Sequence, residues 1–261
     1  MVAGVHAPDE TPLSALARKL LRRSASDLAA AGARPWACCW TLAAPSATSA
    51  DELAAAARAF LEEAHAFGFA VFGGDLATAP CTVLTATVFG RPGPRPAPGR
   101  RGARPGDVLV VTGRLGGAVR SGRHLLPTPR LAEGARLVAL GAHALMDLSD
   151  GLARDLPRLL EAGGVGAVVD LDALPIAPEL AGLPRDQALA AAVGEGEDYE
   201  LLAALAPRTA ARALDDPVLA ATGLTRIGRV VAAPGLAWRL DGRAAAAPAD
   251  GWEHRWNPPS S

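Results

Sequence analysis

The segment Asp147–Gly151 combines two aspartates and a serine directly after a short apolar run. Residues 144–146 are typical of the end of a buried strand, and the leucines of 152–160 fall on one face of a helix. The polar side chains are therefore predicted in the turn between them, where a helix N-terminus offers unpaired N–H groups that suit phosphate. Paired acids suit Mg²⁺, which shares oxygen ligands with substrate phosphates. A plain helix cap is the alternative, and the pattern favours a metal–phosphate site.

The composition excludes several classes of protein. At 261 residues, half of them apolar and a fifth charged, the chain is long enough for one large or two modest globular domains. A net charge of −1 gives no reason to expect nucleic acid or a membrane surface as a partner. No apolar run is long enough to cross a bilayer. The three cysteines have neither disulfide nor zinc spacing, so we expect a cytoplasmic protein.

The lysine content narrows the possible phosphate chemistry. Lys19 is the only lysine, and it lies in a predicted helix rather than in a glycine-rich loop. A Walker-A site and the protein-kinase fold each need a lysine in a defined loop or strand. Any phosphate chemistry must therefore use metal ions, arginine and backbone amides.

Strands and helices alternate along both halves of the chain, which predicts layered α/β domains. The predicted helices are 11–32, 49–68, 130–140, 152–162, 185–193 and 208–214, and the predicted strands are 35–42, 69–72, 82–89, 108–112, 144–146, 165–171, 199–205, 226–231 and 237–240. A cluster of Gly, Pro and Arg at 90–106 marks the domain junction. We therefore predict two domains, 1–103 and 104–261.

Three further acidic segments accompany the first. Asp27 lies on a helix of small residues, Gly73–Asp75 follows a short apolar strand, and Gly196–Glu200 places acids ahead of another strand. Glycines can let a phosphate approach the backbone. A solvated helix acid and a plain turn explain the first two equally well. Each signal is weak alone, whereas all four in this order form a strong pattern.

In that order the four segments resemble the thiamine-monophosphate kinase family of the AIR-synthase-like superfamily. The resemblance rests on the motifs Gly4–His6, Ser26–Ala30, Gly73–Asp75, Arg104–Asp107 leading into Val111–Gly113, Asp147–Leu152 and Gly196–Leu201, and it covers essentially the whole chain. The fold expected is α/β, with two domains that each contain a mostly antiparallel or mixed sheet covered by helices on one face. ATP would lie between the domains, and a homodimer would form through the N-terminal sheet.

The resemblance implies transfer of the γ-phosphoryl group of ATP onto thiamine monophosphate, assisted by several Mg²⁺ ions, to give thiamine diphosphate. Carried over by motif, the metal ligands are Asp27, Asp75, Asp147 and Asp150. The ATP contacts are Gly74, Arg100 and Ser149, with the register of the arginine uncertain by one residue, and the thiamine contacts are His6, Glu197 and Trp252. A flat indole such as Trp252 can stack on a cationic heterocycle, although an ordinary packing tryptophan is the alternative.

The chain also departs from the family pattern. Family members carry a further N-terminal segment, with a Gly-Asp-Asp motif and another aspartate, before the equivalent of Met1. Arg23 and its two successors replace a Val-Asn-Leu-like run, and Glu195 replaces a glycine. Two hypotheses follow: a kinase whose start lies upstream, or a non-catalytic relative that binds nucleotide. A different ATP-dependent enzyme of the superfamily is a further alternative, against which the Asp198–Leu202 block argues.

Overall fold

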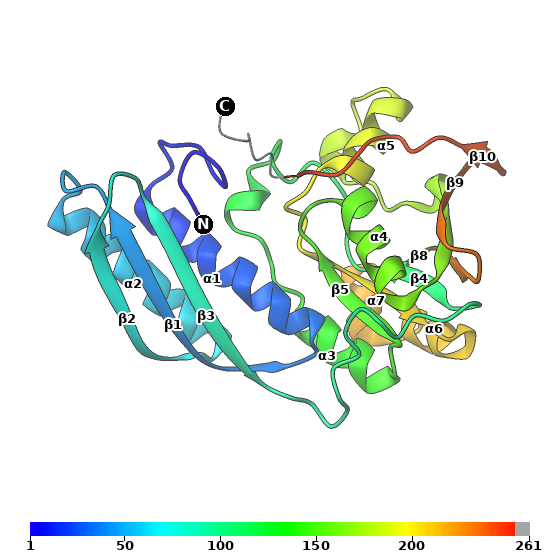
Figure 1. Ribbon diagram of the computed structural model, residues 1–261, viewed down its shortest axis with the longest axis horizontal. Coiled ribbons are helices and arrows are strands. Elements are labelled where there is room, and N and C mark those ends of the chain that lie inside the picture. Colours follow the sequence, from blue (N-terminus) through cyan, green and yellow to red (C-terminus); the bar gives the residue numbers. More distant parts are fainter. Residues whose placement is uncertain (254–261) are drawn as a thin grey trace, which may run out of the picture.

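The first half of the chain is a three-stranded sheet with two helices on one face. The computed structural model describes residues 1–253, and Figure 1 shows this half on the left, in blue and cyan. Its elements are α1 (Leu13–Ala30), β1 (Arg34–Ala44), α2 (Ala50–Phe67), β2 (Ala70–Thr78) and β3 (Val83–Arg91). β1 is central, parallel to β2 and antiparallel to β3.

Helix α2 begins and ends where its sequence signals predict. The Ser49 side chain accepts the Glu52 N–H, and the Glu52 carboxylate accepts the Ser49 N–H in return, which is a capping box. Gly68 ends the helix with a positive φ of 81°, a conformation that glycine adopts without strain. The helix packs on the sheet through Phe60, whose ring stacks on Trp40 with centroids 4.5 Å apart.

Strand β2 differs from its prediction. A buried strand at 69–72 ending at the glycines was expected, but β2 continues through Gly73 and Gly74 to Thr78 and is mostly exposed. It lies at the edge of the sheet, with β1 as its neighbour. A Cβ atom on Gly74 would lie 2.4 Å from the Trp40 carbonyl oxygen. Close approach of the two strands therefore explains this glycine.

The second half is a seven-stranded sheet in the order β10-β9-β6-β8-β4-β7-β5. Its strands are β4 (Val108–Val111), β5 (Ala144–Leu148), β6 (Gly166–Asp170), β7 (Glu200–Leu205), β8 (Thr225–Val231), β9 (Gly235–Leu240) and β10 (Arg243–Ala245). Its α-helices are α3 (Leu131–Leu140), α4 (Leu152–Gly163), α5 (Arg185–Gly194), α6 (Pro207–Leu214) and α7 (Pro217–Thr222). In this sheet all pairs are antiparallel except β6 with β9, whereas the first sheet is mixed, so the predicted α/β fold with mostly antiparallel or mixed sheets is confirmed.

Helices cover both faces of the second sheet, whereas one covered face was expected. Leu109 and Val111 of β4 pack in one apolar cluster with α4 and α5. Val108 and Val110 pack in another cluster with α3, α6 and α7. The central strands are apolar on both faces because each face meets its own helices. The sequence of β4, four successive apolar residues, is typical of such a fully buried strand.

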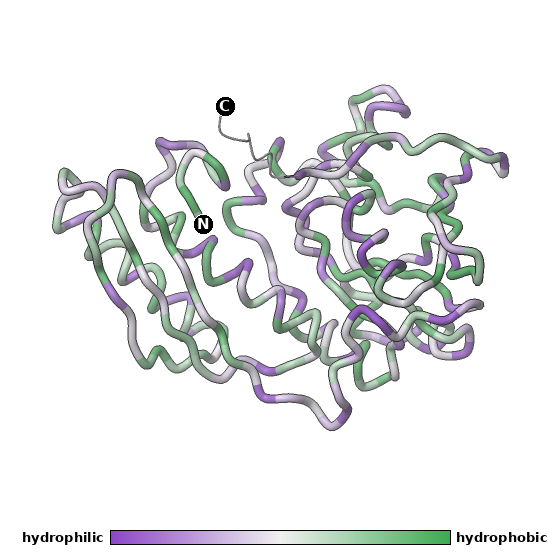
Figure 2. Tube along the Cα trace, in the orientation of Figure 1, coloured by the Kyte–Doolittle hydropathy of each residue, from purple (hydrophilic) through white to green (hydrophobic). Residues whose placement is uncertain are grey.

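The segment 92–106 connects the two halves, and Figure 2 shows hydrophilic residues along it. The chain's N-terminus lies between the two sheets, where the Met1 amino group donates to the Leu84 carbonyl. The boundary at 103/104 stays a prediction. Within residues 1–253, none of the helices is both long and apolar enough to cross a membrane.

Candidate active site

Asp147 lies inside strand β5 rather than in the turn after it, which corrects its predicted position. The carboxylate is buried, and the Ser26 hydroxyl of α1 donates to its Oδ2 at 2.7 Å. Burial raises the pKa of Asp147 to about 6, against the effect of the Ser26 hydrogen bond, and the charge of Asp27 raises it further. Asp27 and Asp147, far apart in sequence, therefore form an interacting acidic pair.

Two arginines act on Asp27. Asp27 is exposed to solvent, but partial desolvation by its neighbours raises its pKa, while the positive charges of Arg23 and Arg100 act to lower it. Arg100 belongs to the connecting segment and is one of the residues predicted to contact ATP. The fold thus brings a residue of the connecting segment near Asp27 of α1.

The turn after β5 is held by the first turn of α4. The Asp155 carboxylate accepts the backbone N–H groups of Ser149 and Asp150 at 3.0 and 2.9 Å. Arg158 donates to Asp150 at 2.6 Å and to Asp155 at 2.8 Å. Two of the N–H groups near this helix N-terminus are therefore satisfied by the protein itself. The N-cap residue is Gly151, so neither Ser149 nor Asp150 caps the helix with its side chain, and the metal–phosphate site stays a prediction.

The block 196–199 pairs with this same turn. The Glu197 N–H donates to the Ser149 carbonyl, and the Tyr199 N–H to the Leu148 carbonyl, each at 2.8 Å. A Cβ on Gly196 would lie 2.4 Å from the Ser149 carbonyl oxygen, so the contact requires glycine. Two motifs that are separate in the sequence therefore form one continuous wall.

Glu197 has an unusual backbone conformation, and its side chain pairs with a buried lysine. Glu197 has a positive φ of 69°, and Tyr199 one of 53°, values uncommon outside glycine. Lys19 of α1 is fully buried and places its Nζ 2.6 Å from Glu197 Oε2 and 2.5 Å from the His6 carbonyl oxygen, to which it donates. One lysine therefore joins the substrate residues predicted from both halves of the chain.

The other two acids here, Asp198 and Glu200, form hydrogen bonds with residues of the neighbouring loop and with Arg130. The Asp198 carboxylate accepts the Gly116 N–H at 2.8 Å, and the Glu200 carboxylate accepts the Thr112 hydroxyl and two bonds from Arg130. Burial raises the pKa of Asp198 to about 7, against the effect of the Gly116 bond. Among the three acids, Glu197 alone lines the cavity described next.

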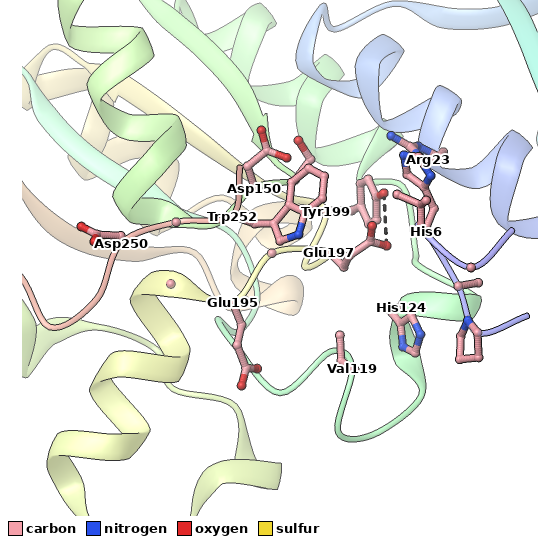
Figure 3. A pocket seen from close by; sticks show the side chains of 18 residues that line it. His6, Arg23, Val119, His124, Asp150, Glu195, Glu197, Tyr199, Asp250 and Trp252 are labelled. Atoms are coloured by element: carbon pink, nitrogen blue, oxygen red, sulfur yellow. Dashed lines mark hydrogen bonds between the residues drawn. The ribbon is translucent and has the colours of Figure 1, made fainter. Parts of the chain in front are cut away.

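A cavity of about 1060 Å³ lies between the two halves of the molecule. Figure 3 shows its labelled side chains: His6 and Arg23 come from the N-terminal half, and Glu197, Tyr199 and Trp252 face them from the C-terminal half. The predicted residues that line it are His6, Ser149, Asp150, Glu197 and Trp252. The structure thus brings all three predicted thiamine contacts together with part of the predicted ATP and metal site.

The acidic residues fit a magnesium ion that takes part of its coordination from substrate. Mg²⁺ is usually held by one or two carboxylates, with phosphates and waters completing its shell. Asp27 and Asp147 supply such a pair, and their raised pKa values indicate that a nearby cation would stabilise the charged forms. Among residues 1–253 there is no cluster of three or more acidic, histidine or cysteine side chains that could hold a metal alone.

Asp75 and Gly74 lie apart from this arrangement. Asp75 is exposed and pairs in register with Thr41, whose neighbour Leu42 is buried against the helices. Because side chains alternate along a strand, Asp75 points to the outer face of the sheet, away from α1. Neither residue is among those lining the cavity.

Sequence reasoning found Asp27 on α1 but missed the parts that Lys19 and Arg23 of the same helix contribute. Lys19, Arg23 and Asp27 are spaced four residues apart, so they lie on one face of the helix. The four-residue spacing, and the fact that Lys19 is the only lysine, could have indicated from the sequence that this helix face is functional. Ser26 gave no such signal, because its partner Asp147 is remote in sequence.

Two family models match this chain: "AIR synthase related protein, N-terminal domain" over residues 1–91 and "AIR synthase related protein, C-terminal domain" over residues 104–241. A thiamine-monophosphate kinase from Rhodopirellula baltica is 36% identical over 88% of this chain and 73% of its own length. The thiamine-monophosphate kinase structure from Stenotrophomonas maltophilia K279a is 36% identical, with a TM-score of 0.79 over 94% of this chain and 84% of that one. The structure of AaThiL complexed with AMPPCP and TMP is 26% identical, with a TM-score of 0.83 over 98% and 85%. This chain belongs to the thiamine-monophosphate kinase family of AIR synthase related proteins.

Proposed function

We propose that this protein transfers the γ-phosphoryl group of ATP to the phosphate of thiamine monophosphate, giving thiamine diphosphate and ADP. The observation that carries the proposal is the single cavity that joins a cation-binding carboxylate and an indole to the acidic turn at Asp150. The relative solved with AMPPCP, an ATP analogue, and TMP supports the same pair of substrates.

The substrate end of the cavity suits a cationic heterocycle. The Trp252 indole offers a face on which the thiazolium ring stacks, and the Glu197 carboxylate offers opposite charge. Lys19 fixes the Glu197 carboxylate through its 2.6 Å ion pair, and its bond to the His6 carbonyl fixes the loop that carries the imidazole. These contacts orient the substrate so that its phosphate extends toward the acidic residues.

The acidic end suits nucleotide and metal. Asp27, Asp147 and Asp150 would hold Mg²⁺, which when bound neutralises the charge of two phosphates that must approach one another. Ser149 and Arg100 are proposed to contact ATP, since Ser149 lines the cavity and the charge of Arg100 acts at Asp27. Asp75 is proposed as a metal ligand and Gly74 as an ATP contact from the family motif alone, because neither residue lines the cavity.

The direct test is formation of thiamine diphosphate from thiamine monophosphate, ATP and Mg²⁺, with omission of each component as the control. Glu197→Gln should raise the KM for thiamine monophosphate by about tenfold, because it removes the charge facing the heterocycle. Glu161→Gln, an exposed acid on α4, is the matched control. A chain that binds ATP but forms no product would be the non-catalytic relative instead.

We also propose a homodimer formed through the outer face of the first sheet. Trp36, Phe72 and Phe89 are 50%, 63% and 41% exposed, and the rings of Phe72 and Phe89 touch with centroids 5.7 Å apart. Apolar groups gathered on an uncovered sheet face mark an interaction surface. Light scattering after gel filtration should give twice the chain mass, and Phe72→Ser should lower it. Val218→Ser, at an exposed position on α7, should leave it unchanged.

A further inference from the structure

Arg23 lies on α1 between two functional parts of the cavity. Lys19, one turn before it, binds Glu197 at the heterocycle end, and Asp27, one turn after it, belongs to the acidic pair. With a rise of 1.5 Å per residue, four residues advance about 6 Å along the helix axis. The Arg23 side chain therefore leaves the helix midway between the heterocycle end and the acidic end.

Unlike neighbouring arginines of α1, Arg23 has no side-chain partner in the part of the chain that the structure describes. Arg18 and Arg22 bind Glu63 of α2, and Arg22 also donates to the Pro127 carbonyl. The Arg23 side chain has no hydrogen bond or ion pair with residues 1–253, not even with Asp27 one turn away. An exposed helical arginine would be the ordinary explanation, but Arg23 is half-buried and lines the cavity.

The charge of Arg23 acts on both sides of the cavity. Together with burial, it lowers the pKa of His6. It also opposes the rise in pKa that loss of solvent contact causes at Asp27 and Tyr199. Figure 3 shows Arg23 beside His6, across the cavity from Trp252 and Asp150. It is the only arginine or lysine among the lining residues that the structure describes. A free guanidinium in such a place matches a phosphate, which accepts two of its N–H groups.

We propose that Arg23 binds the phosphate of thiamine monophosphate and makes this protein prefer the phosphate ester over free thiamine. This inference rests on the proposed function for its substrate. The heterocycle is held between Trp252 and Glu197, so its phosphate reaches along α1 past Arg23 toward the acidic pair. Arg23 thus neutralises the acceptor phosphate on the side opposite the nucleotide, where repulsion between the two phosphates would otherwise be greatest.

Calorimetric binding of thiamine monophosphate and of thiamine, with Mg²⁺ present, tests the assignment without relying on turnover. Wild-type protein should prefer the phosphate ester, and Arg23→Met should reduce that preference about ten- to hundredfold, the value of a charge-assisted contact. Arg23→Lys should restore most of the preference. Arg212→Met, at an exposed position on α6, is the matched control and should retain it.

Kinetics supply the second measurement. In Arg23→Met the KM for thiamine monophosphate should rise by a similar factor while the KM for ATP changes less than about threefold, since the contact is with the acceptor. An unchanged preference for the phosphate ester, or a rise in the KM for ATP alone, would overturn the inference. If wild-type protein binds selectively through Arg23 but forms no thiamine diphosphate, the proposed function fails and the binding role of Arg23 stands. Arg23→Gln replaces the methionine variant if that variant does not fold.

Discussion

The two sheets of this protein present their functional residues in different ways. In the seven-stranded sheet, which is covered on both faces, the end of β5 and the block 196–199 are locked by backbone hydrogen bonds. The three-stranded sheet, which is covered on one face, contributes no strand residue to the cavity lining. Its half of the molecule acts through α1 and the loop at 4–8 instead. The wall formed by the end of β5 and the block 196–199 is thus joined to helix α1 mainly by side-chain contacts. Substitutions in the wall and in α1 should therefore differ in their effects on stability and on substrate binding.

The largest expected effect is on the free energy of unfolding, and it contrasts the core of the second sheet with the exposed edge of the first. Leu156 of α4 is fully buried in the second sheet's core, whereas Leu76 of β2 is 58% exposed. Leu156→Ala should lower the free energy of unfolding by about 3–5 kcal/mol, because it leaves a cavity. Leu76→Ala should cost less than about 0.5 kcal/mol. Urea titration measures both, and similar losses would mean that the first sheet's edge is covered in solution.

Asp147→Asn should separate activity from stability. The asparagine keeps the shape and an acceptor for the Ser26 hydroxyl, but it removes a charge that burial disfavours, as the raised pKa indicates. The thermal midpoint should hold or rise, while kcat for thiamine diphosphate formation should fall by at least about a hundredfold. Retained kcat would remove Asp147 from the proposed metal ligands.

Lys19→Met should weaken the contact between helix α1 and the wall that contains Glu197. The substitution leaves Glu197 and the His6 carbonyl without their shared donor, and breaking a largely buried pair should cost about 2–3 kcal/mol. The KM for thiamine monophosphate should rise about tenfold, since Glu197 is then free to move. Lys19→Arg tests whether charge alone suffices. A KM equal to that of wild type would show that Glu197 is positioned by its backbone alone.

The smallest expected effect is a pH dependence of stability that arises from Asp198, next to Glu197. Burial raises the pKa of Asp198 to about 7, so between about pH 4 and 7 the unfolded chain loses a proton that the folded chain keeps. This group therefore contributes stability at low pH that is lost as the pH rises toward 7. Asp198→Asn should flatten that decline by less than about 4 kcal/mol, the limit that a shift of about three pKa units sets at about 1.4 kcal/mol per unit.

Chemical or thermal unfolding at a series of pH values measures this difference between Asp198→Asn and wild type. Glu161→Gln should keep the wild-type profile, because Glu161 is exposed. Parallel profiles for wild type and Asp198→Asn would show that Arg123 and the Gly116 N–H keep the carboxylate charged in the folded protein.

The sequence by itself determined the features that depend on neighbours in the chain. The capping box at Ser49 and the left-handed Gly68 bound α2 where predicted, since both act within one turn of the helix. The alternation of strands and helices gave the fold class, and the motif order gave the family. The residues predicted to contact thiamine, His6, Glu197 and Trp252, do line one cavity.

Only the tertiary structure decided which of these residues meet and what holds them. Asp147 is in a strand because β7 extends the pairing to Leu148, and β2 passes through its glycines because Gly74 must lie against the Trp40 carbonyl. The ion pair of Lys19 with Glu197 and the bond of Ser26 to Asp147 join residues far apart in sequence, so no local pattern encodes them. Such contacts exist because α1 docks between the two sheets, where the burial of a charge requires a partner that only the folded chain brings within reach.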